Sequence, residues 1–150
     1  MSVNEYFDII ADNSHFFNWA PYILDSKDIY NKFPDYYYIL VPFYYSYLEE
    51  LIRSITSQYG REVIDENGKE ICRKVGINLI DLAIEENNSD IEIVNKLNYL
   101  KKYFKYSTSV DNGNNRNSTM HGYMHPRFWS EDAFEELLKD IADFSKYACF

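Results

Sequence analysis

The sequence predicts an all-α protein: a single domain over residues 1–150, built as an up-and-down bundle of four to five main helices. Apolar residues recur at three- and four-residue spacings along most of the chain, which is the period of an amphipathic helix. Only five Gly and four Pro are present, too few for a turn-rich β protein. No stretch alternates apolar and polar residues convincingly, as a half-buried strand would. Helices are expected at residues 2–12, 15–31, 35–58, 69–86, 89–106 and 131–148.

The first half of the chain contains its most apolar segment, residues 36–48. A helix that is apolar on nearly every side is either buried or shared with a partner chain. Its tyrosines suit core or interface packing, which we favour, although such rings could also stack on nucleic-acid bases. The segment is too short to span a bilayer, so no membrane association is expected. Upstream, Pro21 should kink or break the helix at 15–31, and His15 should occupy a structural position at that helix's start.

The later helices are placed by turn and capping patterns. Polar residues 60–68 predict a connection, and the helix after it should carry Cys72 on its apolar face as a small hydrophobe. Ser89 and Glu92 have the spacing of a capping box, in which a hydroxyl and a carboxylate each bond the other's backbone N–H. Ser130 is expected to cap the last helix.

The most chemically capable stretch is the segment from Asn114 to His125, which reads NNRNSTMHGYMH. Within it, Arg116 would suit phosphate oxygens, His121 could donate or accept a proton, and Asn117 could orient the imidazole or a substrate. On a regular helix, side chains five positions apart diverge by roughly 140°. The arginine and the histidine can therefore meet only if the segment is partly non-helical or if a second copy of the chain completes the site.

The order of these residues is similar to a known signature. Asn117 directly follows Arg116, and Gly122 and Tyr123 directly follow His121. The pattern Arg-Asn-x-x-x-His-Gly-Tyr resembles that of HEPN domains, small helical domains of prokaryotic toxins and RNA-targeting defence proteins. The resemblance implies a bundle that dimerises so that Arg and His of both chains line one cleft, with catalytic Arg116 and His121 and supporting Asn117. It also implies metal-independent RNA cleavage with the ribose 2′-hydroxyl as nucleophile, and it makes Tyr123 the counterpart of a tyrosine that an antitoxin modifies in some pairs.

Three further residues of the segment, Asn115, Tyr123 and His125, are second-tier candidates for the site. His121 and His125 have the H-x-x-x-H spacing that could hold a metal on a helix. No Glu follows His121, no Cys lies nearby, and Pro126 disfavours helix at the residue before it. We therefore expect no metal and no cofactor, and we expect any helix in this segment to end by about Met124.

The charge of the chain bears on the choice between functions. The formal net charge is −9, which is unfavourable for broad nucleic-acid binding. Lys101, Lys102 and Lys105 precede the segment and could attract phosphate, but a solvated helix end is the favoured interpretation. The alternative to a dimeric endoribonuclease is a non-catalytic helical module that binds protein or RNA, in which the segment only caps helices. A toxin neutralised by an antitoxin protein is a third interpretation.

The compartment is inferred from cysteine content and the N-terminus. The two cysteines, Cys72 and Cys149, are far apart and form no disulfide framework or metal-binding spacing. The first residues carry early acidic side chains and no basic region of a signal peptide. Both observations predict a cytoplasmic protein.

Overall fold

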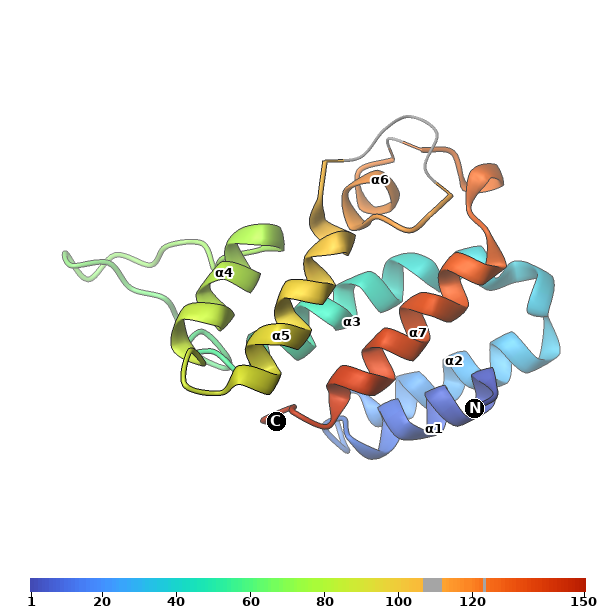
Figure 1. Ribbon diagram of the computed structural model, residues 1–150, viewed down its shortest axis with the longest axis horizontal. Coiled ribbons are helices and arrows are strands. Elements are labelled where there is room, and N and C mark those ends of the chain that lie inside the picture. The colour runs from blue at the N-terminus through green and yellow to red at the C-terminus, as the bar shows by residue number, and fades with distance from the viewer. Residues whose placement is uncertain (107–111, 123) are drawn as a thin grey trace.

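The computed structural model describes residues 1–106, 112–122 and 124–150, and it confirms an all-α fold (Figure 1). The only bridge of β type within these ranges is an isolated one between Ile64 and Glu70. None of the helices described is long and apolar enough to cross a membrane. The α-helices are α1 (Val3–Asp12), α2 (Ala20–Lys32), α3 (Val41–Ser54), α4 (Gly76–Glu86), α5 (Ile91–Leu100), α6 (Arg116–Met120) and α7 (Glu131–Ser145). The described part of the chain also contains three 3-10 helices, η1 (Pro34–Ile39), η2 (Lys101–Phe104) and η3 (Pro126–Phe128).

Helix α3 is the centre of the bundle. It contacts α4, α6 and α7, while α1 packs between α2 and α7 on the far side of the core (Figure 1). The α3 side chains that are completely buried are Tyr44, Tyr45, Tyr47, Leu48, Leu51 and Ile52. The tyrosine-rich segment is therefore mainly core, as favoured from its composition, although Tyr36 at the surface is half exposed.

Two of the expected helices begin later than predicted, and proline explains both. Pro21 and Pro42 lie in the first turns of α2 and α3, where backbone N–H groups have no acceptor within the helix, so the missing N–H of proline costs no hydrogen bond. Of the two effects expected of Pro21, a kink or a break, the structure has the break: residues 16–19 form turns, and α2 begins only at Ala20. The prediction of one continuous helix from residue 35 was wrong, because α3 begins only at Val41. His15 has the structural role expected of it, because its Nδ1 accepts backbone N–H bonds from Phe17 and Asn18 at 3.3 and 3.2 Å.

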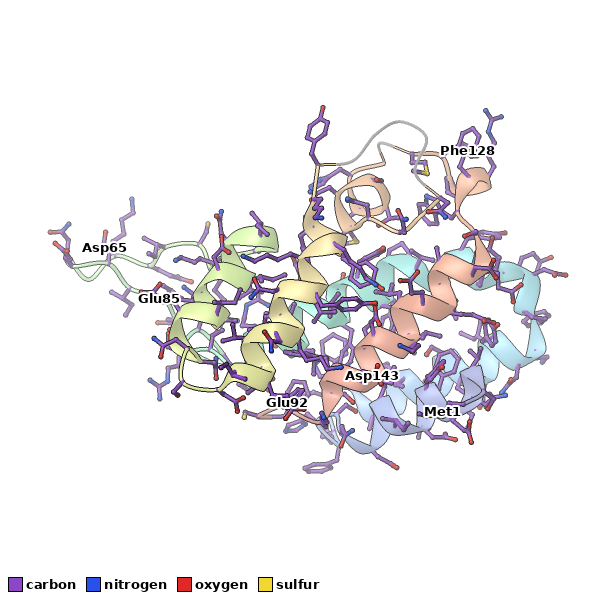
Figure 2. All side chains as sticks on the ribbon, in the orientation of Figure 1. Met1, Asp65, Glu85, Glu92, Phe128 and Asp143 are labelled. Carbon is purple, nitrogen blue, oxygen red and sulfur yellow. The ribbon has the colours of Figure 1, made fainter. Side chains whose placement is uncertain are left out.

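The predicted helix from residue 69 was wrong over its first seven residues. Residues 57–75 instead form a protruding loop whose tip carries Asp65 (Figure 2). The Asp65 carboxylate accepts the N–H groups of Asn67 and Lys69 at 2.8 and 2.9 Å, which commits the backbone to a turn. Cys72 is consequently exposed in an extended segment and is not a core residue. Helix α4 begins only at Gly76, whose φ of +58° is a left-handed value that ends the extended segment.

Capping decides where α5 and α7 begin. Asp90, and not Ser89, caps α5: its carboxylate accepts the N–H groups of Glu92 and Ile93 at 3.0 and 3.1 Å. The predicted capping box was thus wrong by one residue. Ser130 caps α7 as predicted, with its Oγ accepting the Ala133 N–H at 3.2 Å.

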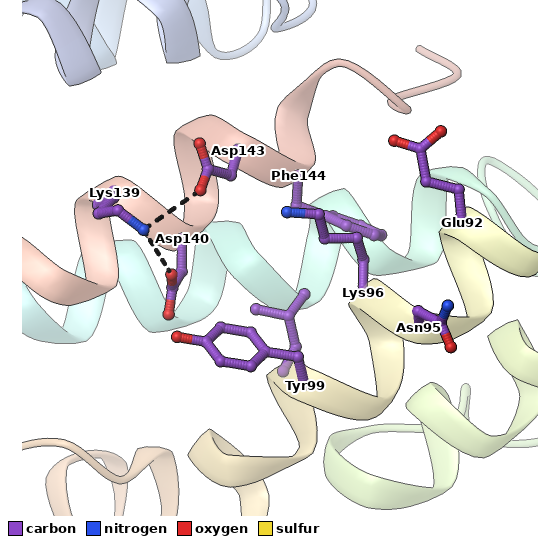
Figure 3. A pocket seen from close by; sticks show the side chains of 9 residues that line it. Glu92, Asn95, Lys96, Tyr99, Lys139, Asp140, Asp143 and Phe144 are labelled. Carbon is purple, nitrogen blue, oxygen red and sulfur yellow. Dashed lines mark hydrogen bonds and ion pairs between the residues drawn. The ribbon is translucent and has the colours of Figure 1, made fainter. Parts of the chain in front are cut away.

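The lysines at the end of α5 are held by carboxylates. Lys101 pairs with Asp81 at 2.8 Å, and Lys102 pairs with Glu136 and Asp140 at 2.6 and 2.7 Å. Asp140 also faces a cavity of about 340 Å³ between α5 and α7, where Lys139 contacts both Asp140 and Asp143 (Figure 3). Because their charge is already matched, Lys101 and Lys102 are poor candidates for a phosphate-attracting patch.

The buried tyrosines make stability sensitive to alkaline pH. Burial raises the pKa of Tyr44 and Tyr47, and burial together with the Asp140 carboxylate raises the pKa of Tyr103. Unfolded tyrosine ionises near pH 10, so these groups contribute full stability below about pH 10 and lose it as the pH rises toward their folded pKa. Each of these tyrosines should lower the free energy of unfolding by about 1.4 kcal/mol per pH unit in that window. We expect cooperative unfolding by about pH 12 in circular dichroism, with tyrosinate absorbance rising at the same midpoint.

A matched pair of variants tests the cause. The Tyr47 hydroxyl is buried without a hydrogen-bond partner among the residues described, so Tyr47→Phe should keep or raise stability at neutral pH and reduce the alkaline loss. Tyr106→Phe removes a hydroxyl from a side chain that is 89% exposed and should change neither. A free energy of unfolding that stays constant from pH 9 to pH 11 would contradict the explanation.

Candidate functional site

Within the segment that carries the Arg-x4-His pattern, Arg116–Met120 form the short helix α6, and hydrogen bonds of Asn115 fix its N-terminus. Asn115 is buried and caps the helix, with its Oδ1 accepting the Asn117 N–H at 2.8 Å. Its Nδ2 donates to the Lys105 carbonyl at 2.7 Å, which ties α6 to the end of η2. The second-tier candidate Asn115 therefore has the geometry of a cap, and its side chain is directed into the fold.

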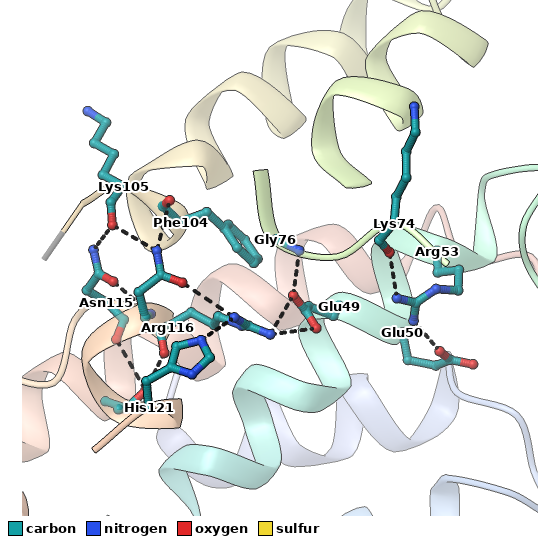
Figure 4. A network of polar contacts seen from close by, with 12 residues as sticks. Glu49, Glu50, Arg53, Lys74, Gly76, Phe104, Lys105, Asn115, Arg116 and His121 are labelled. Atoms are coloured by element: carbon teal, nitrogen blue, oxygen red, sulfur yellow. Dashed lines mark hydrogen bonds and ion pairs between the residues drawn. The ribbon is translucent and has the colours of Figure 1, made fainter. Parts of the chain in front are cut away.

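Arg116 and His121 meet within one chain. Helix α6 ends at Met120, and His121 follows it with non-helical backbone angles (φ −100°, ψ 7°). The Arg116 Nη1 atom lies 3.3 Å from His121 Nε2 (Figure 4). Of the two alternatives left by the spacing, a partly non-helical segment is what the structure contains.

The pairing with Arg116 indicates the tautomer of the imidazole. A guanidinium has only donors, so Nε2 must be the acceptor in this contact, and the proton of the neutral ring lies on Nδ1. His121 is exposed at the surface, whereas only 13% of the Arg116 side chain is exposed. The site thus presents a solvent-facing imidazole backed by a largely buried cation.

Asn117 supports the arginine more than the histidine. Its Oδ1 lies 3.4 Å from Arg116 Nη1, and its Nδ2 reaches the carbonyls of Phe104 and Lys105 at 3.4 and 3.3 Å. These contacts are long, and they fix the amide so that its oxygen faces the guanidinium. The side chain of Lys105 extends away from this network, and only its backbone takes part (Figure 4).

Glu49 of α3 belongs to the same network and was missed from the sequence. Its Oε1 and Oε2 lie 3.2 and 3.3 Å from Arg116 Nη2, and only 11% of its side chain is exposed. Oε1 also accepts the backbone N–H of Gly76 at 2.7 Å (Figure 4). Glu49 lies 67 residues before Arg116, and on a helix full of core residues no local pattern distinguishes it.

The second-tier candidate His125 lies apart from this network. The His125 Nδ1 accepts the Arg127 N–H at 3.2 Å and so caps η3. Together with Tyr38, Pro126 and Arg127 it lines an open hollow of about 410 Å³. The Arg127 guanidinium lies 4.6 Å from the Phe128 ring centroid, and no ion pair of Arg127 is found in the part of the chain that the structure describes. Tyr123 lies outside the described residues.

The side chains of the network decide which chemistry it can support. Residues 1–106, 112–122 and 124–150 contain no cluster of three or more His, Cys, Asp or Glu side chains that could hold a metal. What the network offers is proton transfer at an exposed imidazole and a guanidinium Nη1 directed to the same place. No family model, no curated protein and no solved structure matches the chain.

Proposed function

We propose that this protein is a HEPN-like, metal-independent endoribonuclease that acts as a homodimer. The observation that supports the proposal most is the 3.3 Å contact between Arg116 Nη1 and the exposed His121 Nε2. A proton-transfer group and a cation beside it are what cleavage of a phosphodiester requires. The resemblance of the Arg-x4-His pattern to HEPN domains supplies the substrate class, which is RNA.

The reaction would proceed by attack of a ribose 2′-oxygen on the adjacent phosphorus. The bond to the 5′-oxygen breaks as the new bond forms, leaving a 2′,3′-cyclic phosphate and a free 5′-hydroxyl. One imidazole takes the proton from the 2′-hydroxyl, and a second proton must reach the departing 5′-oxygen. A dimer would supply two copies of His121 for these two transfers, while Arg116 would stabilise the charge on the phosphoryl oxygens.

The alternative function is a non-catalytic helical module that binds a protein or an RNA. The specific observation in its favour is the Glu49 carboxylate, which already neutralises Arg116 and would compete with a phosphate. The formal net charge of −9 points in the same direction. In this alternative, the contacts of Arg116, Asn115 and Asn117 serve only to hold α6 on α3 and η2.

The experiment that tests the proposal is incubation of the purified protein with RNA in the presence of EDTA. We expect cleavage that EDTA does not inhibit, with products ending in a 2′,3′-cyclic phosphate, and we expect Arg116→Ala and His121→Ala to lose it. Cleavage that persists in both variants would refute the assignment, since it would come from a contaminant or from another site. Sedimentation velocity over a range of protein concentrations tests the dimer, which should dissociate together with the activity.

A place in a toxin–antitoxin pair is part of the proposal and rests on the resemblance alone. The partner would be a nucleotidyltransferase-type antitoxin protein, and Tyr123 would be the residue that it modifies. A change in the mass of Tyr123-containing peptides on co-expression with such a partner would be the supporting observation. An unchanged mass, with toxicity also unchanged, would remove this part of the proposal and leave the nuclease untouched.

A further inference from the structure

The Glu49 carboxylate is the point at which three separate elements meet. It extends from α3, accepts the first backbone N–H of α4 from Gly76 at 2.7 Å, and pairs with Arg116 at the first position of α6 (Figure 4). Because the Gly76 bond holds one oxygen in place, the carboxylate is a fixed anchor and not a flexible surface group. Glu49 is 9% exposed as a residue, so solvent screens the pair with Arg116 only weakly.

The Glu49 carboxylate contacts a single nitrogen of the Arg116 guanidinium. Both Glu49 oxygens approach the same nitrogen, Nη2, at 3.2 and 3.3 Å. The Arg116 Nε is buried and has no hydrogen-bond partner among the residues described. With Nη2 occupied and Nε enclosed, Nη1 is the nitrogen directed toward His121, and it also lies 3.4 Å from Asn117 Oδ1.

We propose that Glu49 is a positioning residue that orients Arg116, so that Nη1 alone faces His121 and the bound phosphate. It does not touch the substrate; it acts through Arg116. The proposal rests on the endoribonuclease function for its catalytic consequence, but the orientation of the guanidinium is a property of the free protein. It also implies that the site contacts a phosphoryl oxygen through a single N–H group of this arginine and not through a bidentate fork.

Glu49→Gln is the variant that tests the proposal. An amide has one acceptor oxygen, so it can keep the Gly76 bond but must then turn its NH₂ group toward Arg116 Nη2, where two donors meet. We expect kcat to fall on the order of 10- to 100-fold from the misplaced guanidinium. KM should stay within about threefold, because the interaction that is lost acts in the transition state and not in substrate binding.

A readout without RNA accompanies the kinetics. In the natural protein the Nη1 and Nη2 protons of Arg116 should give separate NMR signals, because the Glu49 and His121 contacts slow rotation of the guanidinium. In Glu49→Gln these signals should merge through fast exchange. Glu49→Asp, which keeps the charge but is one methylene shorter, should give an intermediate kcat and provides the test if the Gln variant fails to fold.

Glu50→Gln is the matched control. Glu50 is the next residue of α3 and also pairs with an arginine, Arg53 at 2.8 Å, but it does not contact α6 through any bond described. It should leave kcat, KM and the Arg116 signals unchanged.

The outcomes separate the two proposals. A folded Glu49→Gln protein with natural kcat and separate Arg116 signals would overturn the positioning role. An increase in kcat or a marked fall in KM would also overturn it, since Glu49 would then restrain Arg116. If the natural protein cleaves no RNA, the nuclease proposal fails, and the NMR measurement still decides whether Glu49 orients Arg116.

Discussion

His121→Gln is expected to lose RNA cleavage by about 10²- to 10⁴-fold, the range typical of removing a general acid or base. Glutamine keeps a polar group near Arg116 Nη1 but cannot take up or release a proton near neutral pH. The imidazole is exposed and its one described side-chain contact is that with Arg116 at 3.3 Å. Its replacement should therefore change the free energy of unfolding by no more than about 0.5 kcal/mol. Initial rates of cleavage and urea unfolding curves, measured on the same preparations, test both parts.

The chain has only three histidines, which makes the controls complete. His15→Gln removes a histidine that caps a turn before α2, and it should leave cleavage unchanged. His125→Gln, at the start of η3, shows whether the second histidine of the segment contributes to RNA cleavage. Equal losses in His15→Gln and His121→Gln would mean that the effect is not catalytic.

Gly113→Ala is expected to destabilise the protein by about 3 kcal/mol or more, from two causes that act together. Gly113 has a φ of +88°, a left-handed value that costs an L-residue with a Cβ. An added Cβ would also lie 2.8 Å from Trp129 Cβ and 3.2 Å from Trp129 Cα. The backbone cannot easily move away, because the Gly113 carbonyl accepts the Tyr45 hydroxyl at 2.9 Å and the Asn112 carbonyl accepts the Ser130 N–H at 2.7 Å.

Gly122→Ala is the matched control for this effect. Its φ of +65° gives a similar backbone strain, but no atom of the described residues lies within 4 Å of an added Cβ. It should cost only the strain, on the order of 1–2 kcal/mol. Urea unfolding of the two variants separates the backbone strain from the steric contact with Trp129. Equal losses in the free energy of unfolding would show that this contact does not contribute.

The parts of the fold that follow from the sequence are those encoded within a few neighbouring residues. The apolar segment 36–48 favoured a helix packed in the core or an interface, and Ser130 as a cap predicted the start of α7. The errors have local causes too. The spacing of apolar residues from 69 onward predicted a helix, but the Asp65 carboxylate accepts backbone N–H groups there and forms a turn instead. Asp90 caps α5 in place of Ser89 because its carboxylate reaches two N–H groups.

The sequence by itself determined the all-α class, the buried tyrosine helix and the kinds of side chain in the Arg-x4-His segment. Only the tertiary structure decided that Arg116 and His121 touch within one chain and that Glu49 holds the guanidinium from the other side. The physical reason is distance along the chain. Periodicity and capping act over three or four residues, whereas a buried ion pair across 67 residues forms only after α3 and α6 have packed together.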